Sequence, residues 1–462
     1  MSRSCSVAGR NALVLGLGLT GFSMARYLHE HEAHVRVIDT RAAPPFLGSL
    51  RKELPKVGFT AGELAADDVV GVDVIAISPG VPKDNPVIAA AVARGVELVG
   101  DVELFARALP AGQKVIAITG SNGKTTVTSL VGALCAAARL SASVAGNIGE
   151  PVLDVLRGLG GGDWPDVFVL ELSSFQLETT FSLAPLAATV LNVTENHLDR
   201  YADMDSYAAA KARIFTRGSV QVLNRDDPRS LSMRLPGRVV ETFGAGMPAL
   251  EEEWGLVHRA DGVTWLARGG QLLLPTSDLK LVGRHNALNA LAALALVSTV
   301  APVKKRVLGA LAAFEGLPHR VQQVLEAGGV LFVNDSKGTT VAATSVALQG
   351  LGRPVVLIAG GDGKGQDFAP LRGIVNDHCR AVLLIGRDAQ AMAQAFEGTQ
   401  ARIEIADTLD RAVERAMDLA RDGDAVVLSP ACASLDQFPN YVARGERFMQ
   451  LVRERNGEAL NA

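Results

Sequence analysis

Cysteine is scarce in this sequence and follows no pattern. Four cysteines occur among 462 residues, and none belongs to a C-x-x-C pair. They stand far apart, at Cys5, Cys135, Cys379 and Cys432. This usage supports neither a disulfide framework nor a zinc site built from paired thiolates. It predicts a protein of a reducing compartment, the cytoplasm.

Long apolar runs are also missing. Residues 1–10 contain no apolar signal segment ahead of the first expected strand. The most apolar later tract, residues 287–303, is rich in alanine and is interrupted by Asn289 and Ser298. Such a tract predicts a buried helix rather than a membrane span. We therefore expect no membrane insertion and a cytoplasmic location.

Neither sign of charge is in large excess. The formal net charge is -4, and charged residues make up 20% of the chain. This balance gives no electrostatic argument for nucleic acid or an anionic membrane as a partner. We expect small-molecule partners and a monomeric protein. Because 462 residues exceed the size of one core, we predict domains at residues 1–102, 103–316 and 317–462.

What the sequence does contain is a phosphate-binding loop. The apolar run 115–118 leads into Gly-Ser-Asn-Gly-Lys-Thr-Thr at residues 120–126, and a helix is expected to follow. Backbone N–H groups at such a turn converge on an anion, Lys124 adds a positive charge, and Thr125 offers a hydroxyl to magnesium. The loop is shorter than the general G-x-x-x-x-G-K-T pattern. An ordinary glycine-rich turn is the alternative.

Two further candidate site residues stand at or just after the ends of expected strands. Glu171 ends the strand 166–171, and His197 follows the strand 188–193. Since the carboxyl ends of parallel strands meet at one edge, we expect both side chains near the phosphate loop, with Glu171 placed to hold magnesium. Lys211 lies among alanines on an expected helix, where a solvated lysine is the ordinary expectation.

A second glycine-rich turn stands near the N-terminus. Strand 11–15 leads into Gly-Leu-Gly-Leu-Thr-Gly at residues 16–21 and a helix over 22–30, and Asp39 ends the next strand. This is the dinucleotide fingerprint, which allows an NAD-dependent oxidoreductase. The unit of roughly 100 residues is smaller than a dinucleotide fold usually needs, so a nucleoside diphosphate is a second interpretation. In a third, the glycines only permit close packing.

The remaining segments are more regular. Residues 238–282 alternate in a way that predicts antiparallel strands, and Asn286 and Asn289 share one face of the following helix, as caps or as purine contacts. After residue 317, strands and helices alternate, which predicts a doubly wound parallel sheet. Lysines and hydroxyls at its strand ends predict a crevice that binds a carboxylate.

Several of these motifs together resemble the ATP-dependent Mur ligases. They are residues 119–125, 171–178, 192–201, 283–289 and 318–320. The short phosphate loop is the loop of that family. Four further segments are similar to the members that add D-glutamate to UDP-N-acetylmuramoyl-L-alanine, namely 16–21 with 39–41, 334–339, 360–364 and 429–438.

The resemblance implies an α/β fold of three domains and a ligase reaction. The domains would be an N-terminal Rossmann-like UDP-binding domain, a central P-loop ATPase-type domain and a C-terminal Rossmann-like domain that binds the amino acid. ATP would phosphorylate the L-alanyl carboxylate, and the amine of D-glutamate would capture the acyl phosphate during peptidoglycan precursor synthesis.

The resemblance also implies residue roles. Catalytic roles fall to Lys124, Lys211, His197 and Lys337. ATP contacts fall to Gly120, Ser121, Asn122, Gly123, Lys124, Thr125, Thr126, Asn286, Asn289, Arg320 and Asp335. Magnesium, expected as two ions, would be held by Thr125, Glu171, His197 and Lys211, the last carbamylated. UDP-sugar contacts fall to Leu19, Thr20, Asp39, Thr40, Arg41, Ser78 and Asn147, and D-glutamate contacts to Thr339, Lys364, Ser434, Leu435 and Tyr441.

Alternatives remain at this point. The family fold with another substrate would give a different Mur ligase or a folylpolyglutamate synthetase. Against these, the N-terminal segment argues for a uridine ligand, and Asn122 stands where the alanine-adding relatives usually carry His. A tyrosine at position 441 replaces the phenylalanine often found near the glutamate. An oxidoreductase and a non-catalytic scaffold are the two alternatives from other classes.

Overall fold

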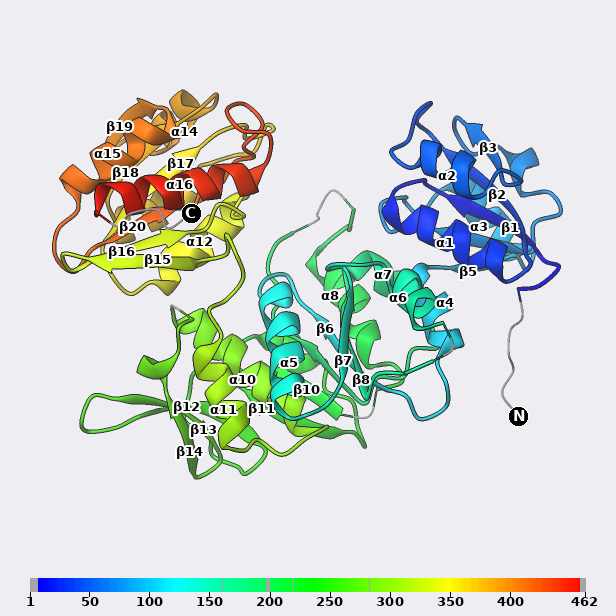
Figure 1. The fold of residues 1–462 in the computed structure, drawn as a ribbon, viewed down its shortest axis with the longest axis horizontal. Helices are drawn as coiled ribbons and strands as arrows, with labels where there is room; N and C mark the ends of the chain where they lie inside the picture. The colour runs from blue at the N-terminus through cyan, green and yellow to red at the C-terminus, as the bar shows by residue number, and fades with distance from the viewer. Residues whose placement is uncertain (1–6, 161, 197–199, 219, 282, 458–462) are drawn as a thin grey trace. The chain divides into compact units, whose positions relative to one another are not determined.

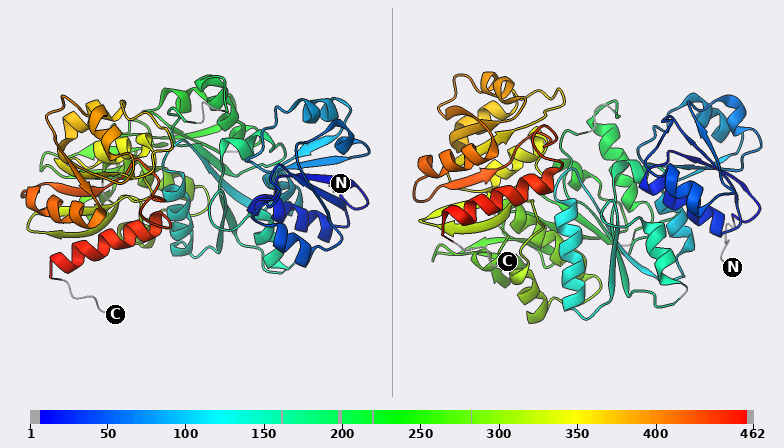
Figure 2. Two further views of the ribbon diagram at one scale, coloured as in Figure 1. Left: turned by 90° about the horizontal axis from the view of Figure 1, so that it is seen from above. Right: turned by 45° about the horizontal axis from the view of Figure 1, so that its top comes forward.

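The computed structural model describes residues 7–160, 162–196, 200–218, 220–281 and 283–457. The chain divides into two compact units, which are described separately. The first comprises residues 1–255, 268–270 and 291–307, and the second comprises residues 256–267, 271–290 and 308–462. Three sheets with flanking helices build these units, so the predicted α/β class is confirmed (Figures 1 and 2).

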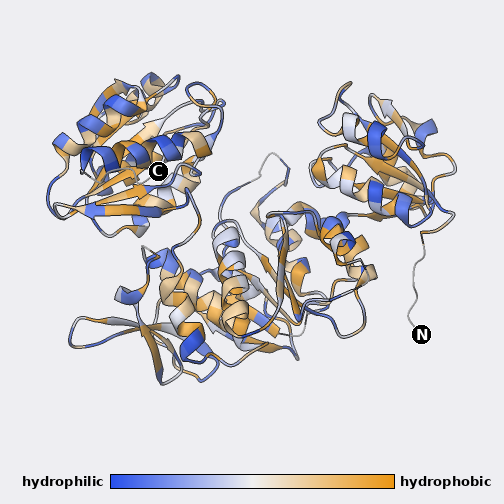
Figure 3. Cartoon of the chain, viewed as in Figure 1, coloured by the Kyte–Doolittle hydropathy of each residue, from blue (hydrophilic) through white to orange (hydrophobic). Residues whose placement is uncertain are grey.

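The N-terminal sheet has five strands in the order β3-β2-β1-β4-β5, all paired in parallel. Its central strand is β1 (Asn11–Leu15). Val14 of β1 packs into one apolar cluster and Leu13 into another. Burial on both faces explains why this strand is a continuous apolar run rather than an alternating one, and Figure 3 shows the apolar colour of the strands.

The other elements of this region follow in chain order. They are α1 (Leu19–Glu30), β2 (His34–Asp39), α2 (Leu47–Glu53), β3 (Gly58–Ala61), the 3-10 helix η1 (Ala66–Val69), β4 (Val74–Ile77), α3 (Pro86–Ala93), β5 (Glu97–Val99) and α4 (Asp101–Ala108). Helix α1 begins three residues earlier than the sequence predicted, so Leu19 and Thr20 belong to its first turn.

The central sheet has nine strands in the order β14-β13-β12-β11-β10-β9-β6-β8-β7. Strand β6 (Lys114–Thr119) pairs in parallel with β8 on one side and β9 on the other. The carboxyl ends of these three strands therefore meet at one edge of the sheet. This edge carries the phosphate loop and Glu171.

The helices and strands of the central region follow in chain order. They are β6, α5 (Lys124–Ala137), β7 (Ala142–Gly146), α6 (Val152–Leu159), β8 (Val167–Glu171), α7 (Ser174–Glu178), β9 (Ala187–Val190), α8 (Met204–Ala212), η2 (Arg213–Phe215), β10 (Val220–Asn224), α9 (Pro228–Ser232), β11 (Val239–Phe243), β12 (Glu253–His258), β13 (Thr264–Arg268), β14 (Gln271–Pro275), η3 (Thr276–Asp278), α10 (Arg284–Ser298) and α11 (Lys305–Ala313).

The antiparallel prediction for residues 238–282 is wrong at β11. That strand pairs in parallel with β10 and with β12. The connection from β10 to β11 runs through the five-residue helix α9, and a crossover of this kind returns the chain in the same direction. A helix this short leaves too little periodicity in the sequence to be recognised.

The C-terminal sheet has six strands in the order β15-β16-β20-β17-β18-β19. Its elements are β15 (Gln322–Ala327), β16 (Val330–Asn334), α12 (Val341–Gly350), β17 (Val355–Gly360), α13 (Leu371–His378), β18 (Cys379–Ile385), α14 (Ala389–Ala395), β19 (Arg402–Asp407), α15 (Leu409–Leu419), β20 (Ala425–Leu428) and α16 (Tyr441–Arg455).

The predicted parallel sheet is confirmed for β16, β17, β18 and β20. Two edge strands were missed. Strand β19 pairs in parallel with β18, whereas β15 pairs antiparallel with β16 through a hairpin that turns at Gly328 and Gly329. Edge strands are exposed on more sides, so their sequences lack the continuous apolar run that marks an inner strand.

The alanine-rich tract forms α10, and its residues from Leu291 to Val297 are fully buried. The predicted buried helix is therefore confirmed. Across the residues that the structure describes, no helix is long and apolar enough to cross a membrane.

Candidate functional site

The phosphate loop joins β6 to α5. Gly123 precedes the helix with a φ of 81°, a left-handed conformation that a residue without Cβ adopts at little cost. No side chain caps the helix at this residue, an arrangement suited to an anion. The ammonium of Lys124 donates to the carbonyl oxygens of Gly120 and Ser121, each at 2.9 Å. Its charge therefore lies inside the loop.

Asn192, two residues after the end of β9, holds the phosphate loop in place. Its side-chain oxygen accepts from the Asn122 N–H at 2.8 Å, and its side-chain nitrogen donates to the Asn122 carbonyl at 3.1 Å. The Ser121 hydroxyl donates to the Thr194 carbonyl at 3.0 Å. The residues after β9 thus hold the phosphate loop, a role that the sequence did not indicate.

Lys211 lies beneath the same loop. It is 1% exposed on α8, and its Nζ donates to the Gly120 carbonyl at 2.9 Å. Its Nζ also stands 4.5 Å from the centre of the Tyr207 ring. Burial, with a smaller contribution from the charge of Lys124, lowers the pKa of Lys211 to about 6. The ordinary expectation of a solvated lysine is wrong, because α8 packs against the loop and buries the side chain.

Glu171 is buried at the end of β8. Its Oε1 accepts from the Asn147 side-chain N–H at 2.9 Å. Its Oε2 is buried and has no hydrogen-bond partner among the described residues. A buried carboxylate oxygen without a partner costs free energy unless a cation or donor joins it.

This donor set fits a magnesium ion. Magnesium prefers oxygen ligands, and it is usually held by one or two carboxylates while keeping several waters. Glu171 provides an available carboxylate oxygen, and Thr125 provides a hydroxyl in the first turn of α5. Among the described residues no three His, Cys, Asp or Glu side chains cluster as a metal site. His197, the other predicted ligand, lies outside those residues.

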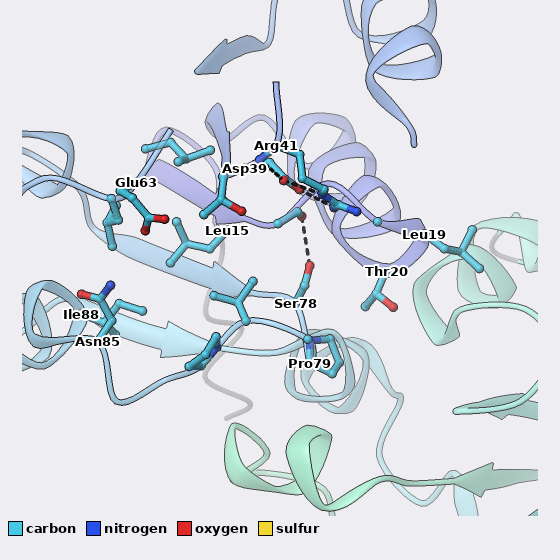
Figure 4. Close-up of a pocket in the computed structure, with 18 of the residues that line it drawn as sticks. Leu15, Leu19, Thr20, Asp39, Arg41, Glu63, Ser78, Pro79, Asn85 and Ile88 are labelled. Atoms are coloured by element: carbon cyan, nitrogen blue, oxygen red, sulfur yellow. Dashed lines mark hydrogen bonds and ion pairs between the residues drawn. The ribbon is translucent and has the colours of Figure 1, made fainter. Parts of the chain in front are cut away.

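A separate pocket of about 760 Å³ opens at the carboxyl ends of β1, β2 and β4 (Figure 4). Its lining includes every residue for which the sequence predicted a UDP-sugar contact, namely Leu19, Thr20, Asp39, Thr40, Arg41, Ser78 and Asn147. The structure therefore brings these residues together, and their ligand stays a prediction. Gln176 and Asn85 also line the pocket and were not predicted to do so. Gln176 belongs to the motif 171–178 but was given no role, and Asn85 stands in no motif.

Asp39 holds Arg41 in this pocket. Asp39 Oδ1 accepts from the Arg41 backbone N–H at 2.9 Å and from its Nε at 2.8 Å. Asp39 Oδ2 accepts from Arg41 Nη2 and from the Leu17 N–H, both at 2.7 Å. The Arg41 hydrogen bonds are the main reason that the pKa of Asp39 is lowered. Figure 4 shows the paired side chains.

These contacts bear on the oxidoreductase alternative. In a dinucleotide site the acid after the second strand accepts hydroxyls of the ribose. A carboxylate offers about four acceptor positions, and in Asp39 four donors already occupy them. The acid therefore positions Arg41, whose side chain is 52% exposed toward solvent.

Gly21 shows that one glycine of the fingerprint serves packing. A Cβ at this position would lie 1.8 Å from the Gly16 carbonyl oxygen. At Gly18, by contrast, no atom lies within 4 Å of the position that a Cβ would occupy. The packing interpretation thus holds for Gly21, while the open space at Gly18 lies where α1 begins without a side-chain cap.

If the predicted nucleotide sugar binds in this pocket, we expect Asp39→Asn to raise its KM about tenfold while leaving kcat within about threefold. The amide keeps the shape and one acceptor oxygen, but an NH2 group in place of Oδ2 cannot accept from Arg41 Nη2 or from the Leu17 N–H, and the remaining bonds lose the carboxylate charge. Each hydrogen bond to a charged group is worth about 1.5–3 kcal/mol, which water partly replaces. Steady-state kinetics with varied nucleotide sugar measure the change. Glu63→Gln, an acid on the rim of the same pocket, is the matched control, and an equal effect of both variants would contradict the anchoring role of Asp39.

In the second unit, Asp335 is a buried carboxyl group after β16. Its Oδ2 accepts from the Ser429 hydroxyl at 2.7 Å, and its Oδ1 accepts from the Val321 N–H at 3.2 Å. Burial raises the pKa of Asp335 to about 7, against the opposing effect of these bonds and of Arg320. Arg320 and Asp335, both predicted to contact ATP, thus interact electrostatically.

We expect Asp335→Asn to change how stability depends on pH. Since the folded pKa is about 7 and the ordinary value is 3.8, the folded state binds more protons between these values, and stability falls as pH rises through this range. The variant should melt several degrees higher than the wild type at pH 8, and the difference should shrink steadily as the pH falls from 7 to 5. Thermal unfolding from pH 5 to 8 tests this. Asp377→Asn, at an exposed position of α13, should show no such trend, and a wild-type curve parallel to that of Asp335→Asn would refute the prediction.

Lys337 and Tyr441 form a pair in the same unit. The Lys337 Nζ lies 4.0 Å from the centre of the Tyr441 ring, and the His319 ring meets that ring edge-on at 5.9 Å. The backbone N–H of Lys337 donates to the His319 carbonyl at 3.0 Å. A cation above a tyrosine face is attracted by the ring, so Tyr441 orients the predicted catalytic lysine.

Arg444 was not predicted as a site residue, because it stands in no recognisable motif. It is 1% exposed, and it donates to the Ser336 hydroxyl and carbonyl at 3.0 Å each and to the Cys432 carbonyl at 3.1 Å. Burial lowers the pKa of Arg444 to about 10. It joins the loop that carries Lys337 to the loop that carries Ser434.

The other predicted residues of this unit occupy varied surroundings. The Asn289 side-chain N–H donates to the Asn286 side-chain oxygen at 3.1 Å, so the two amides do share one helix face. Ser434 is buried, whereas Leu435 is 62% exposed. Lys364 is exposed on a turn after β17, and Thr339 is half-buried on the loop before α12.

Comparison with family descriptions covers most of the chain. Residues 10–100 match "Mur ligase MurD-like, N-terminal domain", residues 118–297 match "Mur ligase middle domain", and residues 319–432 match "Mur ligase, glutamate ligase domain". The three matches follow the order of the three sheets.

Curated relatives are similar over nearly their full length. The UDP-N-acetylmuramoylalanine–D-glutamate ligase of Methylobacillus flagellatus is 54% identical over 453 residues, covering 98% of this chain and 99% of that protein. The protein of the same name from Thiobacillus denitrificans is 53% identical over 464 residues, covering 97% of each chain.

Solved structures share the fold. The MurF ligase from Thermotoga maritima in complex with ADP matches with a TM-score of 0.57 and 17% identity, covering 99% of this chain and 97% of that one. The UDP-N-acetylmuramate-alanine ligase from the same organism matches with a TM-score of 0.56 and 20% identity, covering 96% and 99%. At these identities the likeness concerns the fold alone.

Proposed function

This chain belongs to the Mur ligase family, and on that premise we propose that it joins D-glutamate to UDP-N-acetylmuramoyl-L-alanine in an ATP-dependent reaction of peptidoglycan precursor synthesis. The observation that carries the proposal is the single pocket lined by all seven predicted UDP-sugar residues, in a chain 54% identical to a ligase of that name.

The reaction proceeds in two balanced steps. The L-alanyl carboxylate oxygen attacks the γ-phosphorus of ATP, which forms an acyl phosphate and releases ADP. The neutral amine of D-glutamate then attacks the acyl carbon and loses one proton to the solvent, an amide bond forms, and inorganic phosphate leaves with the bonding electrons of the C–O bond. Lys124 offsets the negative charge that gathers on the transferred phosphoryl group. Phosphorylation replaces a poor oxide leaving group with a good one.

Magnesium is part of the proposal, as two ions that neutralise phosphate charge when bound. Thr125, Glu171, His197 and a carbamylated Lys211 would hold it. Support comes from the unpartnered Oε2 of Glu171 and from the buried Lys211 amine beside the phosphate loop. A carbamate turns that amine into a hard oxygen ligand.

The remaining roles follow the predicted assignments. Asn286, Asn289, Arg320 and Asp335 would contact ATP, and Lys337 would stabilise the transferred phosphate. Thr339, Lys364, Ser434, Leu435 and Tyr441 would contact D-glutamate. The domain limits 1–102, 103–316 and 317–462, a monomeric state and a cytoplasmic location belong to the same proposal.

Phosphate release tests the function. Purified protein with ATP and magnesium should release phosphate only when both UDP-N-acetylmuramoyl-L-alanine and D-glutamate are present. Mass spectrometry should show a product heavier than the nucleotide-sugar substrate by one glutamyl residue. Release with UDP-N-acetylmuramate and L-alanine, or with a diamino acid in place of D-glutamate, would reassign the substrate within the family.

A further inference from the structure

Three loops of the C-terminal sheet carry the proposed D-glutamate contacts. Thr339 stands on the loop between β16 and α12, Lys364 on the loop after β17, and Ser434 on the loop after β20. Because the loops are far apart in sequence, their mutual spacing decides whether the three side chains reach one small substrate together.

Gln366 stands on the loop after β17, two residues from Lys364, and its side-chain amide bonds within that loop, to the start of α12 after the first loop, and to the third loop. Its Oε1 accepts from the Val341 N–H at 3.1 Å, two residues after Thr339. Its Nε2 donates to the Gly363 carbonyl at 3.1 Å, next to Lys364, and to the Ala431 carbonyl at 3.0 Å, three residues before Ser434. The amide thus uses both of its N–H groups and its oxygen on these loops.

Two of the backbone segments that it contacts are strained. Lys364 has a φ of 52° and Ala431 a φ of 56°, left-handed conformations that residues with a Cβ rarely adopt. Such conformations persist where the surrounding structure holds them, and they gather at functional sites. The Gln366 side chain bonds to Ala431 itself and to the residue that precedes Lys364.

Backbone hydrogen bonds join the second loop to the third and the third loop to the first. Asp362 and Ala433 exchange two hydrogen bonds of 2.9 Å, which join the second and third loops. The Ala431 N–H donates to the Gly338 carbonyl at 2.9 Å, which joins the third and first. Gln366 adds a link between the first and second loops, through Val341 and Gly363.

From this network we propose that Gln366 is a positioning residue for the amino-acid substrate, setting the spacing of the loops that carry Thr339, Lys364 and Ser434. The proposal rests on the proposed function, since it takes D-glutamate as the ligand of these loops. Gln366 acts through the loops and does not touch the reacting atoms. The hydrogen bonds of the Gln366 side chain go to Val341, Gly363 and Ala431, none of which is proposed to contact ATP or the nucleotide sugar, so we expect the binding of those two substrates to change little.

The test compares variants of the full-length enzyme in steady-state assays with each substrate varied in turn. Gln366→Met keeps the side-chain volume and removes the three hydrogen bonds, and we expect the KM for D-glutamate to rise about tenfold. The KM values for ATP and UDP-N-acetylmuramoyl-L-alanine, and kcat at saturating D-glutamate, should stay within about threefold. Gln366→Glu should raise the D-glutamate KM further, because its carboxylate faces two carbonyl oxygens.

Gln394→Met is the matched control, since this glutamine is exposed on α14 of the same sheet. Should Gln366→Glu fail to fold, Gln366→Met carries the test. An unchanged KM for D-glutamate in an active Gln366 variant, or an equal rise in all three KM values, would overturn this inference and leave the proposed function standing. If the wild type forms no product with D-glutamate, the proposed function falls and the inference falls with it.

Discussion

Replacing Lys124 by methionine is expected to lower kcat/KM for ATP-dependent phosphate release by about 10³-fold or more. The reason is electrostatic. A positive charge fixed where negative charge develops is worth more than the same charge on a mobile group in solution, because no reorganisation is needed at the moment of reaction. The structure fixes the Lys124 ammonium with two hydrogen bonds to loop carbonyls, so no search through side-chain rotamers precedes its contact with phosphate.

The matched control for this variant is Lys114→Met. Lys114 starts β6 at the opposite end of the strand and is exposed, so its loss should leave phosphate release within about twofold. Circular dichroism and thermal melting establish that both variants fold. A Lys124→Met enzyme with more than a tenth of the wild-type kcat/KM would refute the role of the loop as the reaction centre. A non-catalytic scaffold is the alternative that such a result would revive.

Lys211→Met is expected to lower activity by at least about 10²-fold while raising the melting temperature in bicarbonate-free buffer. Activity falls because methionine cannot form a carbamate, and loss of a metal ligand or its support typically costs 10–100-fold or more. Stability rises because the buried amine of the wild type has lost its hydration. The amine also repels Lys124, a contribution to the lowered pKa of Lys211.

The sign of the pH effect follows from that pKa. The folded pKa of about 6 lies below the ordinary lysine value of 10.5, so the unfolded state binds more protons between these values and stability rises with pH across them. Lys211→Met should lack this slope. Thermal melts from pH 6.5 to 9 measure it, and parallel curves for the two proteins would contradict the assignment.

Carbamylation itself is tested separately from stability. The neutral amine attacks the carbon of carbon dioxide and loses a proton, so protein incubated with ¹³C-bicarbonate should show one carbamate carbon signal that is absent in Lys211→Met. Lys211→Arg serves as the second control, because a guanidinium keeps its charge and forms no carbamate. Wild-type activity in Lys211→Arg would contradict the role of the carbamate, because it would show that a positive charge at this position is sufficient.

Much of the fold could be predicted because its signals are local. Inner strands such as β1 and β17 are short apolar runs bounded by glycine-rich turns, and the spacing of the phosphate loop fits in seven residues. The crossover helix α9 and the edge strand β15 were not predicted, since a five-residue helix and a half-exposed strand leave little periodicity in the sequence. The parallel direction of β11 was missed for the same reason.

The candidate site was predicted in part. Residues in recognisable motifs, among them Lys124, Glu171 and Asp39, were identified from the chain. Arg444 and Gln366 were missed, because neither stands in a pattern and each acts only through contacts with residues distant in sequence. The sequence likewise did not predict that the acceptor positions of Asp39 are filled, since this depends on the conformation of the Arg41 side chain, which donates two hydrogen bonds to Asp39.

The sequence by itself determined the class of fold, the two glycine-rich turns and the family resemblance, because each depends on residues close together in the chain. The tertiary structure decided that Lys211 is buried beneath the phosphate loop and that Glu171 keeps one carboxylate oxygen without a partner. It also decided that one amide links three loops. These facts depend on the order of strands in each sheet, which brings together groups far apart in the chain, such as Gly120 and Lys211 at a separation of 91 positions. Short windows of sequence do not encode that order.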